Sequence, residues 1–183
     1  MDTKIILLIA HVFSAIIGAG GAFVSDGIFL TAIKDGRITR DELRFIHQGS
    51  TFVVAGLIGL ILSGIGLVLM DPAFYFSSSK FLAKISIVGV IILNGIVLHS
   101  IHLPLFRKYA GHELAKEPEF IQKSSLILLS GVISVVSWAS TVILGVMRTI
   151  PYEYEIIMAV YAALIIGGIM NGFLLKKKLL GIS

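Results

Sequence analysis

The chain has 183 residues, of which 56% are hydrophobic and only 14% are charged, and its formal net charge is +4. Soluble domains have about 25% charged residues, so this composition excludes a water-soluble fold and predicts a membrane protein. The absence of cysteine excludes disulfides, thiolate metal sites, iron–sulfur clusters and cysteine nucleophiles.

Five stretches are long and apolar enough for a transmembrane helix, which needs about 20 residues. In chain order they are Ile5–Ile33, Gly49–Met70, Phe81–Leu105, Leu126–Met147 and Ile156–Leu175. Because the links between them are short, we expect residues 1–183 to form one transmembrane domain, an all-α helix bundle embedded in the lipid bilayer. In the first link, Thr39 followed by Glu42 is typical of a capping box and predicts a helix that begins after Thr39.

Basic residues are concentrated on one side of the predicted bundle. Eleven of the fifteen lysines and arginines fall in the first link, the third link and the C-terminal tail. By the positive-inside rule these segments are cytoplasmic, which predicts an N-terminus outside and a C-terminus inside. The first span lacks a clear cleavage site and is expected to remain in the mature protein. The positive-inside rule therefore accounts for the excess of basic residues, and no nucleic-acid partner is expected.

Each span also has a face of small or polar residues at helical spacing. Lipid tails are as apolar as leucine, so such faces mark contacts between helices. On the first three spans these residues are His11, Ser14, Gly18, Gly21 and Ser25; Gln48, Gly56, Gly59, Ser63 and Gly66; and Lys84, Gly95, His99 and His102. Glycine stripes alone favour close packing, whereas histidine and lysine inside a span also suggest function, because ionisable groups are costly in the membrane.

The ionisable residues form two predicted clusters. The outer cluster consists of His11 and Lys84, and the inner cluster consists of His47, His99, His102 and Asp26. Histidine is a common axial ligand of haem iron, and helix bundles often hold cofactors in their cores. We therefore expect the four histidines and Lys84 to be candidate cofactor-binding residues. Alternatives stay open, because interfacial histidines can be merely amphipathic, Lys84 can extend to the membrane surface, and Asp26 can hydrogen-bond a neighbouring helix.

A second interpretation of the inner cluster is a metal site. His99 and His102 are three residues apart and would share one face of an α-helix. With Asp26 they could bind copper or another transition metal. For haem, one of these two histidines would instead pair with a histidine on another helix.

The first span reads His11-Val-Phe-Ser-Ala-Ile-Ile-Gly18-Ala-Gly20-Gly21, and Phe81-Leu-Ala-Lys84 opens the third span. This resembles the small bacterial membrane proteins that include the HemJ-type protoporphyrinogen oxidases and the CopD-type copper-resistance proteins. In that group the first helix has a histidine followed by six residues, usually a tryptophan, and then small residues; here Gly18 takes the tryptophan position. The resemblance implies a haem- or metal-associated bundle in a bacterial inner (plasma) membrane, with His11 and Lys84 as the corresponding residues.

Three functions follow as hypotheses. The first is a redox protein that binds a b-type haem, and a small oxidoreductase would belong to this class. Its partner would be haem or a porphyrin, and no catalytic residue is assigned. The second is a transporter for a metal ion or small solute, and the third is a non-catalytic scaffold or subunit; self-association into a homo-oligomer is compatible with all three. The sequence contains no Gly-x-Ser-x-Gly element, Walker-type loop or dinucleotide fingerprint, which argues against soluble-type hydrolase and nucleotide-binding functions.

Overall fold

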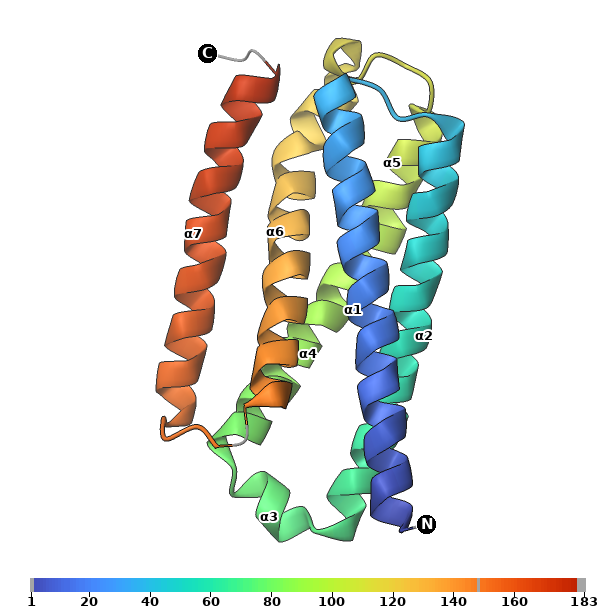
Figure 1. Cartoon of the computed structure of the whole chain (residues 1–183). Helices are drawn as coiled ribbons and strands as arrows, with labels where there is room; N and C mark the ends of the chain where they lie inside the picture. The colour runs from blue at the N-terminus through green and yellow to red at the C-terminus, as the bar shows by residue number, and fades with distance from the viewer. Residues whose placement is uncertain (1, 148, 181–183) are drawn as a thin grey trace.

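The computed structural model describes residues 2–147 and 149–180, with side chains as far as Leu174 in the last helix. The elements are α1 (Thr3–Asp35), α2 (Arg40–Met70), α3 (Pro72–Phe76), α4 (Ser79–Val97), the π-helix η1 (Leu98–His102), α5 (Leu103–Lys108), the 3-10 turn η2 (Leu114–Lys116), α6 (Pro118–Val146) and α7 (Tyr154–Leu180) (Figure 1). The helices α1, α2, α6 and α7 and the continuous run Ser79–Lys108 are each long and apolar enough to cross a membrane. The predicted all-α bundle with five spans is confirmed, and the chain is a multi-pass membrane protein.

The two ends of the bundle differ in the links that they contain. One end, called here the basic end, contains the α1–α2 link, the α5–α6 link and the C-terminal end of α7 (Figure 1). The opposite end contains the N-terminus, α3 and the α6–α7 link. The two internal links rich in lysine and arginine therefore lie at the same end as the C-terminus. The direction in which the bundle crosses the membrane stays a prediction from the positive-inside rule.

Local chain signals explain the turn between α1 and α2. Gly36 ends α1 in the left-handed conformation, with φ of 72°, and its N–H donates to the carbonyls of Ala32 and Ile33. Only glycine adopts this conformation without steric cost. The predicted capping box is confirmed, because the Thr39 hydroxyl accepts the Glu42 N–H while the Glu42 carboxylate accepts the Thr39 N–H at 2.8 Å.

The α1–α2 link is also attached to the α5–α6 link. The Gly111 N–H donates to the Ile38 carbonyl at 2.7 Å, and the Leu114 N–H donates to the Gly36 carbonyl at 2.9 Å. Ile38 and Leu114 are both buried in a small core that closes the basic end. This core joins the α1–α2 link to the ends of α1, α5 and α6.

Helices α1 and α2 pack through the predicted small-residue faces. Gly56 lies against the backbone of Gly18 and Ser14, and Gly49 lies against Gly21. Side chains larger than hydrogen are excluded at these positions because the two backbones approach so closely. Such small-residue contacts are the usual basis of helix association in a bilayer.

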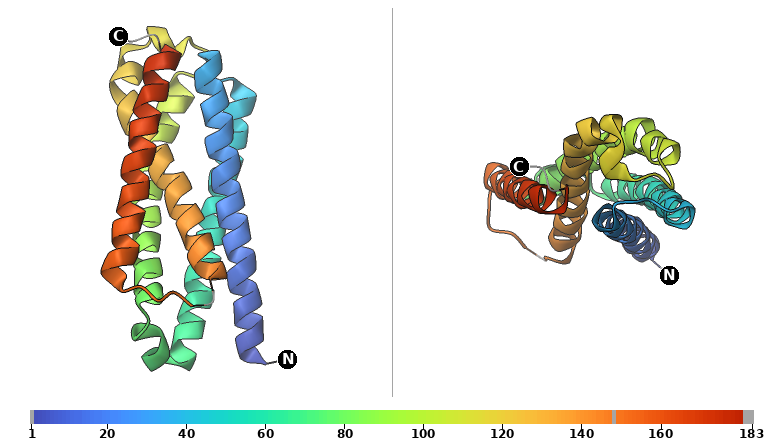
Figure 2. Two further views of the ribbon diagram at one scale, coloured as in Figure 1. Left: turned by 60° about the vertical axis from the view of Figure 1, so that its left-hand side comes forward. Right: turned by 90° about the horizontal axis from the view of Figure 1, so that it is seen from above.

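Helix α6 lies between the α1–α2 pair and α7 (Figure 2). Trp138 of α6 is 2% exposed and covers Gly18 of α1. On the other side of α6, the Ser137 hydroxyl and the Tyr161 hydroxyl of α7 hydrogen-bond at 2.7 Å. The outward faces of the helices expose large apolar side chains, among them Phe13, Ile16, Phe52, Leu62, Leu93 and Leu174, as expected for surfaces in contact with lipid.

Candidate functional site

The candidate site lies in the half of the bundle nearest the N-terminus, where α1 meets α2. His11 is half-buried in α1, and its Nδ1 lies 3.0 Å from the Ser63 hydroxyl oxygen of α2. Gly64 leaves room beside the ring, since a Cβ at this position would lie 3.5 Å from Cε1 of His11. The small-residue packing of α1 on α2 thus brings the imidazole to a fixed partner.

The hydrogen bonds of Ser63 define which nitrogen of His11 holds the proton. The Ser63 hydroxyl donates to the Gly59 carbonyl of its own helix at 2.5 Å, so its oxygen is left to accept from the imidazole. This arrangement favours a proton on Nδ1. Nε2 then has a free lone pair, the state needed to bind a metal or accept a proton.

Lys84 brings a positive charge to the same region. It is half-buried in α4, close enough to His11 for the two groups to interact electrostatically. Its Nζ lies 3.9 Å from the position of a Cβ on Gly145, so α6 leaves space for the ammonium. Within the part of the chain that the structure describes, no hydrogen bond or ion pair holds this ammonium group. The structure therefore places the charge of Lys84 within electrostatic range of His11.

Histidines 47 and 99 lie far from this pair. His47 is 16 residues from Ser63 along α2, which at 1.5 Å per residue is about 24 Å. His99 is 15 residues from Lys84 along the third span, or about 22 Å. Both side chains are exposed on the outer surface, and Nδ1 of His99 lies 2.9 Å from the Gly95 carbonyl. The structure does not bring either of them into contact with His11.

A π-helix separates His99 from His102. Pro104 has no N–H to donate to the carbonyl of Ser100, and the Leu103 N–H bonds instead to the Leu98 carbonyl five residues earlier. The wider turn changes the angular spacing, so that His102 is 1% exposed while His99 is exposed. The expectation that these two histidines share a face is wrong, because it assumed α-helical geometry through this segment.

The buried His102 and the half-buried Asp26 each have polar atoms without a hydrogen-bond partner among the described residues. Neither ring nitrogen of His102 has a partner in the described chain, and the ring stacks on Phe106 at a centroid distance of 6.2 Å. Asp26 has a hydrogen-bonding contact with Ser134 of α6, but its Oδ2 is buried without a partner among the described residues. Among those residues, no three histidine or acidic side chains are grouped so that they could hold a metal ion.

Two serines of α6, Ser130 and Ser137, hydrogen-bond neighbouring helices. The Asn94 amide of α4 donates to the Ser130 carbonyl at 3.0 Å, and the Ser130 hydroxyl donates to Asn94 Oδ1 at 2.7 Å. Asn94 was not among the residues predicted from the sequence to lie at a polar contact inside the bundle. Its position one residue before Gly95, in an otherwise apolar run, was the available sequence signal.

Comparisons with known proteins leave the family open. No protein-family model, no curated protein and no solved structure matches the chain. The resemblance to the HemJ-type and CopD-type proteins therefore stays a prediction that rests on the quoted residues.

Proposed function

We propose that the chain is a membrane-embedded redox protein that binds a b-type haem, with His11 as its axial ligand. The observation that carries this proposal is the hydrogen bond between Nδ1 of His11 and the Ser63 hydroxyl. The Ser63 oxygen can accept the Nδ1 proton, because its own hydroxyl donates to the Gly59 carbonyl, and this leaves Nε2 as the ligand nitrogen. A ligating histidine fixed through its other nitrogen is the usual arrangement at metal sites.

Lys84 supports the same proposal through its charge. Haem has two propionate groups, and an ammonium group close to the axial histidine can neutralise one of them in a medium of low dielectric constant. The donor set of the site, one imidazole and one ammonium, fits a haem with a single protein ligand. A bound haem supplies one-electron redox chemistry. The residues His11, Ser63 and Lys84 supply the binding nitrogen, its orientation and the compensating charge.

The two other hypotheses have less support. A transporter would require polar groups that line a path, but Ser130 and Ser137 on α6 are hydrogen-bonded to Asn94 and Tyr161. A transition-metal site needs several ligands, and the described residues provide no such group. A scaffold without a cofactor makes a simple contrasting prediction, which is a colourless purified protein.

The test is the absorption spectrum of detergent-purified protein from haem-replete cells, oxidised and then reduced with dithionite. The wild type is expected to show a Soret band, with sharper α and β bands after reduction. His11→Ala should lose haem. Ser63→Ala should weaken haem binding about 10- to 100-fold, the usual effect of removing the partner of a ligating histidine.

A matched control is His112→Ala, because His112 lies in the α5–α6 link at the basic end and pairs with Glu117. This variant should keep the wild-type spectrum. Lys84→Gln should lower the reduction potential, since the lost positive charge favoured the reduced haem, whereas Lys84→Arg should keep it close to wild type. A colourless wild type, or a spectrum unchanged in His11→Ala, would show that the proposal is wrong.

A further inference from the structure

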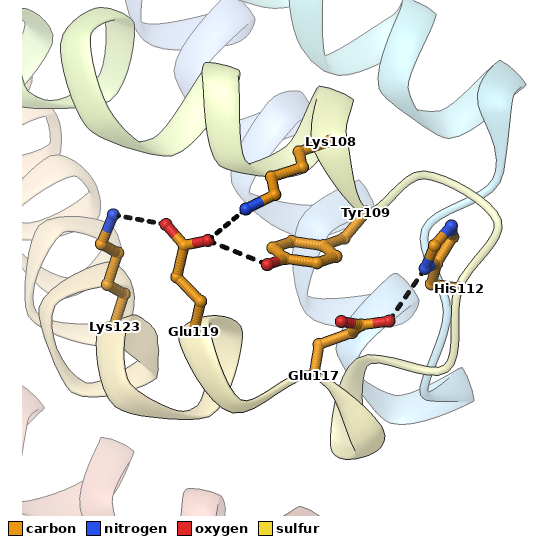
Figure 3. A network of polar contacts seen from close by, with 6 residues as sticks. All are labelled: Lys108, Tyr109, His112, Glu117, Glu119 and Lys123. Atoms are coloured by element: carbon orange, nitrogen blue, oxygen red, sulfur yellow. Dashed lines mark hydrogen bonds and ion pairs between the residues drawn. The ribbon is translucent and has the colours of Figure 1, made fainter.

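A pocket opens between α5 and α6 at the basic end of the bundle. Its volume is about 190 Å³, and Ser100, Pro104, Lys108, Glu119 and Lys123 contribute to its walls together with two apolar side chains. Figure 3 shows the two lysines on either side of Glu119. The pocket is distant from His11 and Lys84, so it is independent of the proposed haem site.

The charges around this pocket are only partly compensated. Glu119 accepts hydrogen bonds from Lys108 at 2.5 Å and from Lys123 at 2.9 Å, and it also accepts the Tyr109 hydroxyl at 2.8 Å (Figure 3). The single negative charge of Glu119 therefore neutralises only one of the two positive charges. Each ammonium has three N–H donors, so donors of both lysines remain for a further acceptor. Lys108 and Lys123 are 60% and 39% exposed, which leaves these donors accessible.

The π-helix explains how the pocket forms. Pro104 interrupts the regular hydrogen bonding of the third span, and the helix continues as α5 after the wider turn η1. Pro104 and Ser100, which stand four residues apart across this interruption, both line the pocket. The carbonyl of Ser100 receives no N–H from position 104. The same local feature therefore creates the space and places a hydroxyl beside it.

The pocket lies where one candidate membrane span ends and the next begins. Lys108 is the last residue of the span Ser79–Lys108, and Glu119 is the second residue of the span Pro118–Val146. The positive-inside rule assigns this end to the cytoplasmic leaflet, whose surface is negatively charged because of anionic lipids. Ile101 and Leu105 form the apolar part of the wall. An apolar wall with cationic donors at one end matches the chemistry of a phospholipid.

We propose that this pocket binds the phosphate group of an anionic phospholipid. The free N–H donors of Lys108 and Lys123 donate to the phosphate oxygens, and the Ser100 hydroxyl provides a further donor. Glu119 competes with the phosphate for the same donors, and its charge limits the net attraction to that of one positive charge. The lipid links α5 to α6 at the point where the third span is interrupted.

The experiment measures thermal unfolding of the full chain in detergent supplemented with phosphatidylglycerol or with phosphatidylcholine. Phosphatidylglycerol should raise the wild-type unfolding temperature more than phosphatidylcholine does. In the double variant Lys108→Gln/Lys123→Gln this preference should disappear, and phosphatidylglycerol binding measured by native mass spectrometry should weaken at least tenfold. Lys116→Gln is the matched control, since Lys116 lies at the same end but pairs with Glu113 outside the pocket.

Equal loss of the lipid preference in Lys116→Gln and in the double variant would overturn the proposal, because the preference would then depend only on the overall charge of this end. If the double variant does not fold, Glu119→Gln tests the proposal instead, since it keeps both ammonium groups and removes the competing carboxylate. This variant should bind phosphatidylglycerol several-fold more tightly than the wild type, and weaker binding would contradict the proposal. Inorganic phosphate without lipid should give no comparable stabilisation; equal stabilisation would overturn the assignment to a lipid.

Discussion

Two helix–helix contacts in this bundle use glycine in different ways. Between α1 and α2, a Cβ added to Gly56 would meet the backbone of Gly18 and the carbonyl oxygen of Ser14. Between α6 and α7, a Cβ added to Gly168 or Gly172 would meet only the side chains of Val132 or Leu128. A backbone atom cannot move away without moving its helix, whereas a side chain can change its rotamer.

This difference explains why the candidate site lies where it does. The close approach of α1 and α2 fixes the distance between His11 and Ser63, because both residues belong to the faces in contact. Helix α7 instead packs on α6 and α4 through larger side chains, such as Tyr161. We infer that α1 and α2 form the rigid part of the bundle and that α7 tolerates more adjustment.

The largest predicted effect is that of Gly56→Ala. The added methyl group has no space beside Gly18, so the helices must separate, and overpacking of this kind costs about 1–3 kcal/mol. Thermal unfolding in detergent measures this loss. The proposed haem binding should weaken in the same variant, because the separation would pull Ser63 away from His11.

The control for this prediction is Gly172→Ala. Here the methyl group meets the side chain of Leu128, which can move, and alanine favours the helix over glycine by about 0.5–1 kcal/mol. We expect a change of less than 1 kcal/mol in either direction. If Gly172→Ala were as destabilising as Gly56→Ala, the distinction between the two contacts would be lost.

The next effect is smaller and concerns the hydrogen bond between Ser137 and Tyr161. Both hydroxyls are buried between α6 and α7. Hydrogen bonds between transmembrane helices contribute about 0.6 kcal/mol on average and at most about 1.7. A double-mutant cycle with Ser137→Ala and Tyr161→Phe should give a coupling energy in this range. A coupling energy near zero would mean that the hydroxyls do not hold α7 on α6.

The sequence was sufficient for the features that repeat along the helices. The five spans follow from runs of apolar residues, and the α1–α2 contact follows from glycines and serines at helical spacing. The capping box at Thr39 and Glu42 was also predictable, because its two partners are only three residues apart. These features depend on neighbours along the chain, which the sequence shows directly.

The features that depend on contacts between distant residues were not predictable in the same way. The partner of His11 could have been any polar residue of another helix, and the structure identifies Ser63 of α2. The expectation that His99 and His102 share one face assumed a regular third span. Pro104 contradicts that assumption, and it was visible in the sequence, but the π-helical turn that accommodates it was not.

The smallest predicted effect concerns the ion pairs of Glu113, which lies in the α5–α6 link at the basic end. Hydrogen bonds from Lys116 and Arg37 lower the pKa of Glu113 below its ordinary value of 4.5. A carboxylate with a lowered pKa stabilises the fold above its ordinary pKa, and this contribution is lost as the pH falls through the lower value of the folded state. Because Glu113 is exposed, the effect should be small and weaker in high salt. Glu113→Gln should reduce the loss of unfolding temperature below pH 4.5, whereas Glu155→Gln, at the opposite end, should leave it unchanged. An equal response of both variants would mean that the ion pairs of Glu113 do not stabilise the link.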